Sequence, residues 1–136
     1  MPKFSKKSQA KLDTCHSDLI RLFEIVVKYF DCTILEGHRG EAKQNLYYYS
    51  RPQKSKVKWP DGKHNKIPSQ AVDAVPYPVN WGESDIVRFY YFGGFVKGIA
   101  TAMDIPIRWG GDWNDDTQTA DERFKDLVHF ELLKED

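Results

Sequence analysis

The chain has 136 residues, of which 40% are hydrophobic and 14% aromatic, and its formal net charge is +0. This length favours one domain, here residues 1–136, with a single hydrophobic core and no separate binding domain. The balanced charge argues against a nucleic-acid-binding protein, which usually carries a basic excess. No apolar run approaches the roughly 20 residues that cross a membrane. We therefore expect no membrane insertion, and we expect a monomer.

The N-terminus and the cysteines indicate where the protein is made. Basic residues occur near the start of the chain, but no apolar segment follows them, so a secretory signal peptide is not expected. Cys15 and Cys32 form no CxxC motif and are expected to be free thiols in a reducing compartment.

Hydrophobic periodicity and turn residues predict an alternation of helices and strands. Helices are expected at 8–14, 17–30, 41–49 and from 83 or 84 to 103, and strands at 32–35, 71–75, 105–109 and 127–133. Ser17 is expected to cap its helix, Leu46 to face inward, and Gly93-Gly94 to mark a close backbone contact. This order predicts an α+β fold with a small antiparallel sheet and helices packed on one side.

Residues 51–69 contain three prolines and little periodicity, which predicts a long surface loop, and long loops in compact domains are often functional. The loop region is basic, with Arg51, Lys54, Lys56, Lys58, Lys63 and Lys66. An acidic cluster follows later, with Asp112, Asp115, Asp116, Asp121, Glu122 and Asp126. Both can be solvated loops, or the lysines can form a basic rim that attracts a substrate bearing carboxylates.

Three separated residues have the types that hold a catalytic zinc ion: His64, Asp73 and His129. Each has a plainer interpretation. His64 can be a mobile surface imidazole, and His129 can lie with Glu131 on an exposed strand face. Asp73, within a short apolar strand, needs a partner, and Arg39 or Arg108 could form a salt bridge with it. The three together, in this order, favour a metal site.

The run His64…Asp73-Ala74-Val75-Pro76, followed by Asp126-x-x-His129-Phe130-Glu131-Leu132, resembles the zinc D-Ala-D-Ala carboxypeptidase and L-alanyl-D-glutamate endopeptidase family. The small phage endolysins of that family are the most similar. Residues 36–39 resemble its arginine-bearing turn, and residues 108–114 resemble the segment before its last catalytic strand. Three features depart from the commonest motif: Gly62 stands where that motif has Ser, the glycine that the motif has between His and Asp is missing, and the gap between His64 and Asp73 is two residues longer.

The resemblance implies a zinc ion held by His64, Asp73 and His129. It implies that Asp126 is the general base and that Arg39 binds a substrate carbonyl or carboxylate. Asp126 and His129 have opposite parity along an ideal strand. The chain must therefore bend near residue 127 for them to converge, and we predict that Asp126 lies in the loop before the strand.

The resemblance also implies a fold like that of Hedgehog signalling domains and D,D-peptidases. The expected substrate is the bacterial peptidoglycan stem peptide, cut at the L-alanyl-D-glutamate bond. Such an endolysin would stay in the host cytoplasm until it is released to the cell wall. Trp109 and Trp113 either line the substrate groove or pack in the core.

Three alternatives remain open. The chain can be a D-Ala-D-Ala carboxypeptidase of the same family. It can be a non-catalytic zinc-binding interaction module, which would need the ligands but not the base Asp126. It can also bind an anionic polymer through its lysine-rich loop, in which case chelators would not affect it.

Overall fold

The computed structural model describes residues 1–120 and 125–133. Its elements follow the predicted order. They are α1 (Lys6–Leu12), α2 (Ser17–Tyr29), β1 (Cys32–Glu36), α3 (Glu41–Tyr49), the 3-10 turn η1 (Lys63–Asn65), β2 (Ala71–Pro76), the 3-10 turn η2 (Glu83–Asp85), α4 (Ile86–Ala102), β3 (Ile107–Gly110) and β4 (Asp126–Leu132). Within the described residues, no helix is long and apolar enough to cross a membrane.

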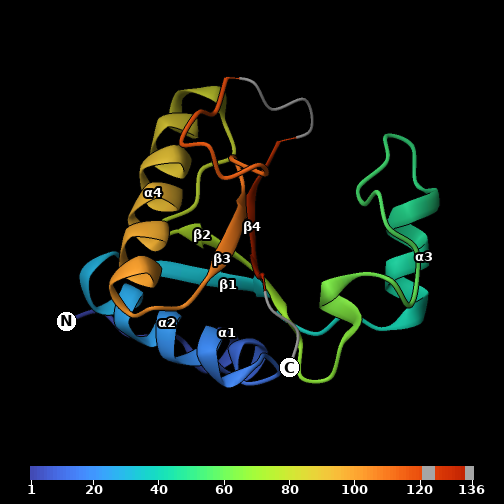
Figure 1. Cartoon of the computed structure of the whole chain (residues 1–136), viewed down its shortest axis with the longest axis horizontal. Helices are drawn as coiled ribbons and strands as arrows, with labels where there is room; N and C mark the ends of the chain where they lie inside the picture. Colours follow the sequence, from blue (N-terminus) through green and yellow to red (C-terminus); the bar gives the residue numbers. More distant parts are fainter. Residues whose placement is uncertain (121–124, 134–136) are drawn as a thin grey trace.

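The four strands form one sheet in the order β1-β2-β4-β3, and every neighbouring pair is antiparallel. Helices α1, α2 and α4 pack against one side of this sheet, whereas α3 stands apart on the other side (Figure 1). The predicted α+β fold with a small antiparallel sheet is confirmed. Because β2 and β4 are the central strands, residues far apart in sequence, such as Asp73 and His129, become direct neighbours.

The core lies between the sheet and helices α2 and α4. Phe23 of α2 and Phe92 of α4 both direct their rings against Phe130 of β4, with centroid distances of 5.5 and 6.0 Å. All three side chains are fully buried, and burying a ring of this size contributes roughly 1.5–3 kcal/mol. Helix α2 begins differently from the prediction, because the cap is His16 and not Ser17. The His16 Nδ1 atom accepts the amide proton of Asp18 at 3.0 Å.

Helix α4 starts at Ile86, after η2, and not at 83 or 84. The predicted close contact is present at Gly93 but not at Gly94. A Cβ atom on Gly93 would lie 2.2 Å from the Trp109 ring, whereas nothing lies within 4 Å of one on Gly94. Gly93 therefore makes room for Trp109, which is only 3% exposed.

Helix α3 packs on polar groups, and the prediction that Leu46 faces inward is wrong. Leu46 is 66% exposed, while Gln44 is fully buried. Residues 41–66, which run from α3 through η1, are called the α3 lobe below. The buried side chains of this lobe, Gln44, His64 and Asn65, are all polar. Hydrogen bonding therefore sets which face of α3 turns inward.

Candidate metal centre

Three side chains meet at one point from three separate elements: His64 from η1, Asp73 from β2 and His129 from β4. One nitrogen of each histidine and a carboxylate oxygen of Asp73 all lie within 4.8 Å of one another. The antiparallel register pairs Asp73 directly with His129. The two imidazole rings stand 5.1 Å apart at an angle of 68°. The structure thus brings together the three residues that the sequence singled out as ligands.

Each imidazole is held by an acceptor on its outer side. The Nδ1 atom of His64 lies 2.7 Å from the carbonyl oxygen of Gly37, and the Nε2 atom of His129 lies 2.8 Å from Glu131 Oε1. Donation of those N–H groups leaves a lone pair on the other nitrogen of each ring. Both lone pairs then point at Asp73 Oδ1, at 3.1 and 3.3 Å. A cation between these three electron-rich atoms removes their repulsion, so the residues fit a metal ion with oriented ligands.

When the imidazoles are protonated, their inner nitrogens donate to Asp73, and the electrostatics of that form lead to the same conclusion. Burial by itself would raise the pKa of Asp73, but the charge of His64 and the hydrogen bonds from both histidines lower it overall. Burial would lower the pKa of His129, yet its hydrogen bonds to Asp73 and Glu131 raise it to about 10. A positive charge is therefore favoured between the two carboxylates, and a bound cation would supply that charge.

Glu131 is a supporting residue whose role the sequence did not reveal. Besides His129, its carboxylate binds Arg108 Nη2 at 2.9 Å and lies 3.6 Å from Lys63 Nζ. Burial would raise the pKa of Glu131, but the hydrogen bonds from His129 and Arg108 lower it to about 2. One sequence feature could have predicted this contact: Glu131 lies two residues after His129, so the two side chains share one face of the strand.

Arg39 lies beside Asp73 in the lining of the cleft, and most of its donors are already engaged. It is 7% exposed, and its guanidinium forms an ion pair with Glu36. It also donates to Gln44 Oε1 at 3.0 Å and lies 3.5 Å from Asp73 Oδ2. Arg39 therefore holds the second carboxylate oxygen of Asp73 while Oδ1 faces the two histidines.

Asp126 lines the same cleft as the three candidate ligands. It is the first residue of β4 and not part of the preceding loop, so that part of the prediction is wrong. Trp109 of β3 pairs with Phe130, but the next residue, Gly110, pairs with Asp126. The register of β4 therefore shifts between Asp126 and Phe130. In an ideal strand Asp126 and His129 would point to opposite faces, and this irregularity lets both line the same cleft. A Cβ atom on Gly110 would lie 2.0 Å from the Asp126 carbonyl oxygen, so glycine permits this approach.

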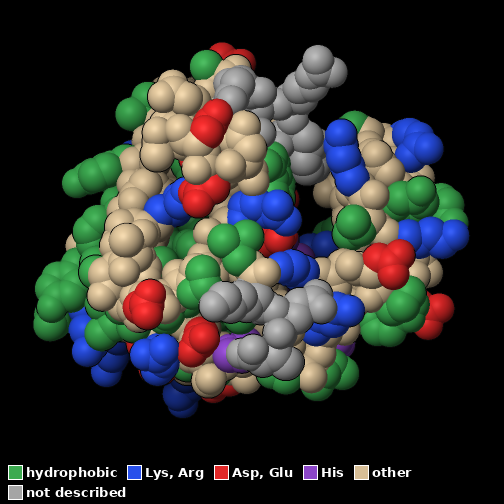
Figure 2. Space-filling model, in the orientation of Figure 1, with side chains coloured by type: hydrophobic (Ala, Val, Ile, Leu, Met, Phe, Trp, Pro, Cys, Tyr) green, Lys and Arg blue, Asp and Glu red, His purple; other side chains and the backbone are tan. Residues whose placement is uncertain are grey.

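The cleft over the centre has a volume of about 580 Å³ and runs between the sheet and the α3 lobe. Basic side chains border the hollow on both sides (Figure 2). Lys54, Lys56 and Lys63 line it from the lobe, and Arg108 lines it from β3. Of the acidic cluster, Asp112 is buried and accepts the amide protons of residues 116 and 117, while Asp121 and Glu122 lie outside the described residues.

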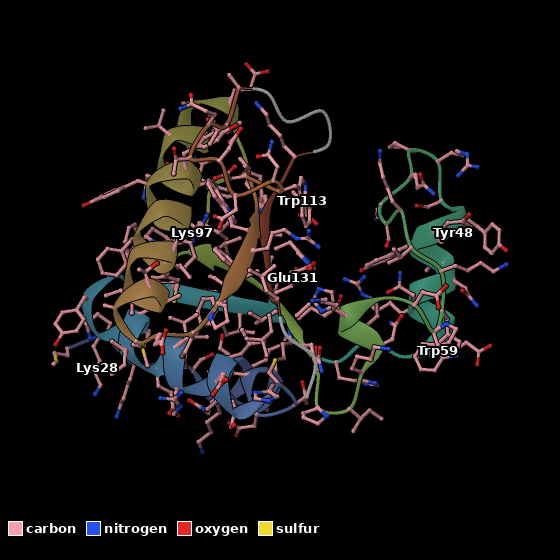
Figure 3. All side chains as sticks on the ribbon, viewed as in Figure 1. Lys28, Tyr48, Trp59, Lys97, Trp113 and Glu131 are labelled. Carbon is pink, nitrogen blue, oxygen red and sulfur yellow. The ribbon has the colours of Figure 1, made fainter. Side chains whose placement is uncertain are left out.

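The two tryptophans of residues 108–114 have different positions. Trp113 lines the cleft, with its ring 5.4 Å from that of His129, and it lies beside β4 on the side that faces the lobe (Figure 3). Trp109 is buried in the core, and its Nε1 atom donates to the carbonyl oxygen of Leu127 at 2.9 Å. Of the two, only Trp113 can meet a ligand in the cleft, and the expectation of a groove-lining role for Trp109 is corrected.

Comparisons with known proteins agree with this geometry. Residues 1–133 match the family model of the phage L-alanyl-D-glutamate peptidase. The crystal structure of the L-Ala D-Glu endopeptidase ChiX from Serratia marcescens is similar, with a TM-score of 0.71 and 25% sequence identity. The similarity covers 96% of this chain and 90% of that chain. No curated protein sequence matches. With its family match over residues 1–133 and this shared fold, the chain belongs to the phage L-alanyl-D-glutamate peptidase family.

Proposed function

We propose that the protein is a zinc-dependent endopeptidase that cuts the L-alanyl-D-glutamate bond of the peptidoglycan stem peptide. The observation that carries this proposal is the convergence of two oriented imidazole nitrogens and one carboxylate oxygen within 4.8 Å at the floor of a cleft. As a phage-type lysin, the protein would remain in the host cytoplasm until it reaches the cell wall.

Zinc suits this donor set, because two neutral imidazoles and one carboxylate leave a position for water or substrate. His64 would bind through Nε2 and His129 through Nδ1, since their other nitrogens are held by Gly37 and Glu131. When bound, the metal would polarise the scissile carbonyl and lower the pKa of the attacking water to roughly 7.

Asp126 is the residue that we assign to proton transfer. Burial raises the pKa of its carboxyl, and the negative charge of Asp73 raises it further. A carboxylate with a raised pKa accepts a proton more readily near neutral pH. Asp126 would take the proton from the attacking water and then give it to the amine that leaves as the peptide C–N bond breaks.

Arg39 would act in two ways. Its contact with Asp73 Oδ2 keeps that carboxylate turned toward the histidines. Its charge, which lies beside Asp73, would also help to stabilise the negative charge that develops on the substrate carbonyl oxygen.

The test uses Asp126→Ala, with Asp31→Ala as a control, because Asp31 directly precedes β1 and is not among the residues that line the cleft. We expect Asp126→Ala to bind zinc like the wild type but to cleave peptidoglycan about 10²–10⁴-fold more slowly. Zinc content and product masses are measured together, with and without a chelator. New D-glutamyl N-termini support the endopeptidase, whereas released D-Ala would indicate a carboxypeptidase. Full cleavage by Asp126→Ala would refute the mechanism.

A further inference from the structure

Arg108 is a cleft residue that the proposed reaction does not yet use. It lies on β3 opposite Glu131, and its side chain is 39% exposed. Its guanidinium stands over the Trp113 ring at 5.7 Å, and the same ring lies 5.4 Å from His129. Arg108 therefore contacts two residues, Trp113 and Glu131, that also contact His129.

The donors of Arg108 are only partly engaged. Glu131 accepts from Nη2, and Nε has no hydrogen-bond partner among the described residues although it is shielded from water. The exposed end of the side chain can take a further acceptor, and a carboxylate is the group that a guanidinium fork binds best. The carboxylate of Glu131 and the ring of Trp113 hold the fork in place beforehand, so little ordering of the side chain is needed on binding.

Two other cations that line the cleft, Arg39 and Lys63, are less available. Arg39 is buried and bound to Glu36, Gln44 and Asp73. Lys63 is held by the carbonyl oxygen of Leu132 and by Glu131. Of these three cations, Arg108 has the most exposed side chain, at 39%, against 8% for Arg39 and 20% for Lys63.

The substrate of the proposed function carries a matching group. The D-glutamyl residue continues the stem peptide through its γ-carboxyl, so its α-carboxyl is free. This α-carboxyl carbon is three bonds from the scissile carbonyl carbon and thus within about 4 Å of it. A carboxylate in that position reaches the neighbourhood of the metal centre whenever the bond is placed for cleavage.

We propose that Arg108 binds the α-carboxylate of the D-glutamyl residue and makes the enzyme select stem peptides with a free acid there over those with an α-amide. This proposal rests on the proposed function, because it names a specificity residue of the same site. An amide has no charge and offers the guanidinium a single acceptor oxygen, so it loses both the ion pair and the two-pronged hydrogen bonding.

The experiment compares N-acetylmuramoyl-L-Ala-γ-D-Glu-L-Lys with the same peptide carrying D-isoglutamine. We expect the wild type to prefer the acid by roughly ten- to a hundred-fold in kcat/KM. Arg108→Gln should bring that ratio to about 1, mainly by slowing cleavage of the acid, and Arg108→Lys should keep part of the preference because charge remains without the fork. The affinity of both peptides for the Asp126→Ala protein, measured by calorimetry, gives the same comparison without turnover.

Arg88 provides a matched control, since its side chain is 36% exposed and it is paired with Asp85 at 3.2 Å. Arg88→Gln should keep the wild-type ratio. The assignment is overturned if Arg108→Gln keeps the wild-type ratio, or if it slows both peptides equally, which would mean a structural role through Glu131. A wild type that cleaves neither peptide would instead refute the proposed function.

Discussion

The cleft has two walls that are stabilised by different interactions. The sheet and helices α1, α2 and α4, here called the sheet body, enclose a continuous cluster of buried apolar side chains. The α3 lobe contributes no residue to that cluster, and its buried side chains are polar. One wall is thus stabilised by hydrophobic burial, which is non-directional, and the other by hydrogen bonds that require particular partners.

Gln44 is the centre of the lobe's hydrogen bonds. Its Oε1 atom accepts from Arg39 at 3.0 Å and from Asn65 at 3.1 Å. Its Nε2 atom donates to Ser55 Oγ at 2.9 Å and to the Val57 carbonyl oxygen at 2.7 Å. One side chain therefore connects α3, the loop after it, the arginine beside Asp73 and the residue next to His64.

The difference matters because the candidate metal centre spans both walls. His64 belongs to the lobe, whereas Asp73 and His129 belong to the sheet body. A bound metal would join the two, and its affinity would depend on how well the polar lobe holds His64 in place.

The largest expected effect tests the apolar wall. Phe23→Ala removes a fully buried ring from the sheet body and should lower the free energy of unfolding by about 3–5 kcal/mol. Leu46→Ala removes an apolar side chain of the lobe that is 66% exposed and should change it by less than about 0.5 kcal/mol. Urea unfolding followed by circular dichroism measures both. A large loss for Leu46→Ala would show that the lobe has an apolar core after all.

The same contrast explains what the sequence could predict of the fold. Helix α2 was predicted closely because its apolar spacing directly reports burial, and Leu19, Leu22 and Phe23 are all fully buried. The inward face of α3 was predicted wrongly because the same rule assigns Leu46 to the interior. A glutamine such as Gln44 is usually exposed, and only the three-dimensional positions of its four partners reveal its burial.

A second effect, of intermediate size, tests the polar wall. Gln44→Leu keeps the side-chain volume but leaves Arg39 and Asn65 without their shared acceptor, at a cost of about 1–3 kcal/mol for each unpaired group. We expect the lobe to hold His64 less rigidly, and the zinc affinity to fall by about 10–100-fold as a result. Competition with a chromogenic chelator measures this affinity.

Gln53→Leu is the matched control, since Gln53 is exposed and donates only to the Tyr48 carbonyl oxygen in the described structure, at 3.0 Å. It should bind zinc like the wild type. Equal zinc affinities for Gln44→Leu and the wild type would show that the network does not position His64.

The candidate site could be predicted from the sequence to the extent that its chemistry depends on residue type. Histidine and aspartate are metal ligands by nature, so His64, Asp73 and His129 stood out despite their separation. Glu131 and Arg108 did not, because a carboxylate and a guanidinium on a strand have many ordinary roles. Their contacts depend on the register between β3 and β4, which pairs Arg108 with Glu131 and which no local pattern specifies.

The smallest expected effect concerns the sheet body when the metal is removed. Cys15 and Cys32 are buried there, and burial raises the pKa of each thiol to about 12. Since these folded-state values lie above the ordinary value of 9.0, the stability gained from keeping the thiols protonated is fully present below pH 9 and is lost as the pH rises toward 12. At pH 8, labelling by a thiol reagent therefore reports opening of the sheet body.

Chelation at pH 8 should speed proteolysis within residues 51–62 by about ten-fold, because His64 no longer ties the lobe to the centre, while thiol labelling changes by less than about two-fold. Limited proteolysis and mass spectrometry of the labelled protein follow the two regions in one sample. If labelling accelerated in step with cleavage, the lobe and the sheet body would open as one unit. The polar wall and the apolar wall would then have the same free energy of opening. The metal would stabilise the whole fold and not only the position of His64.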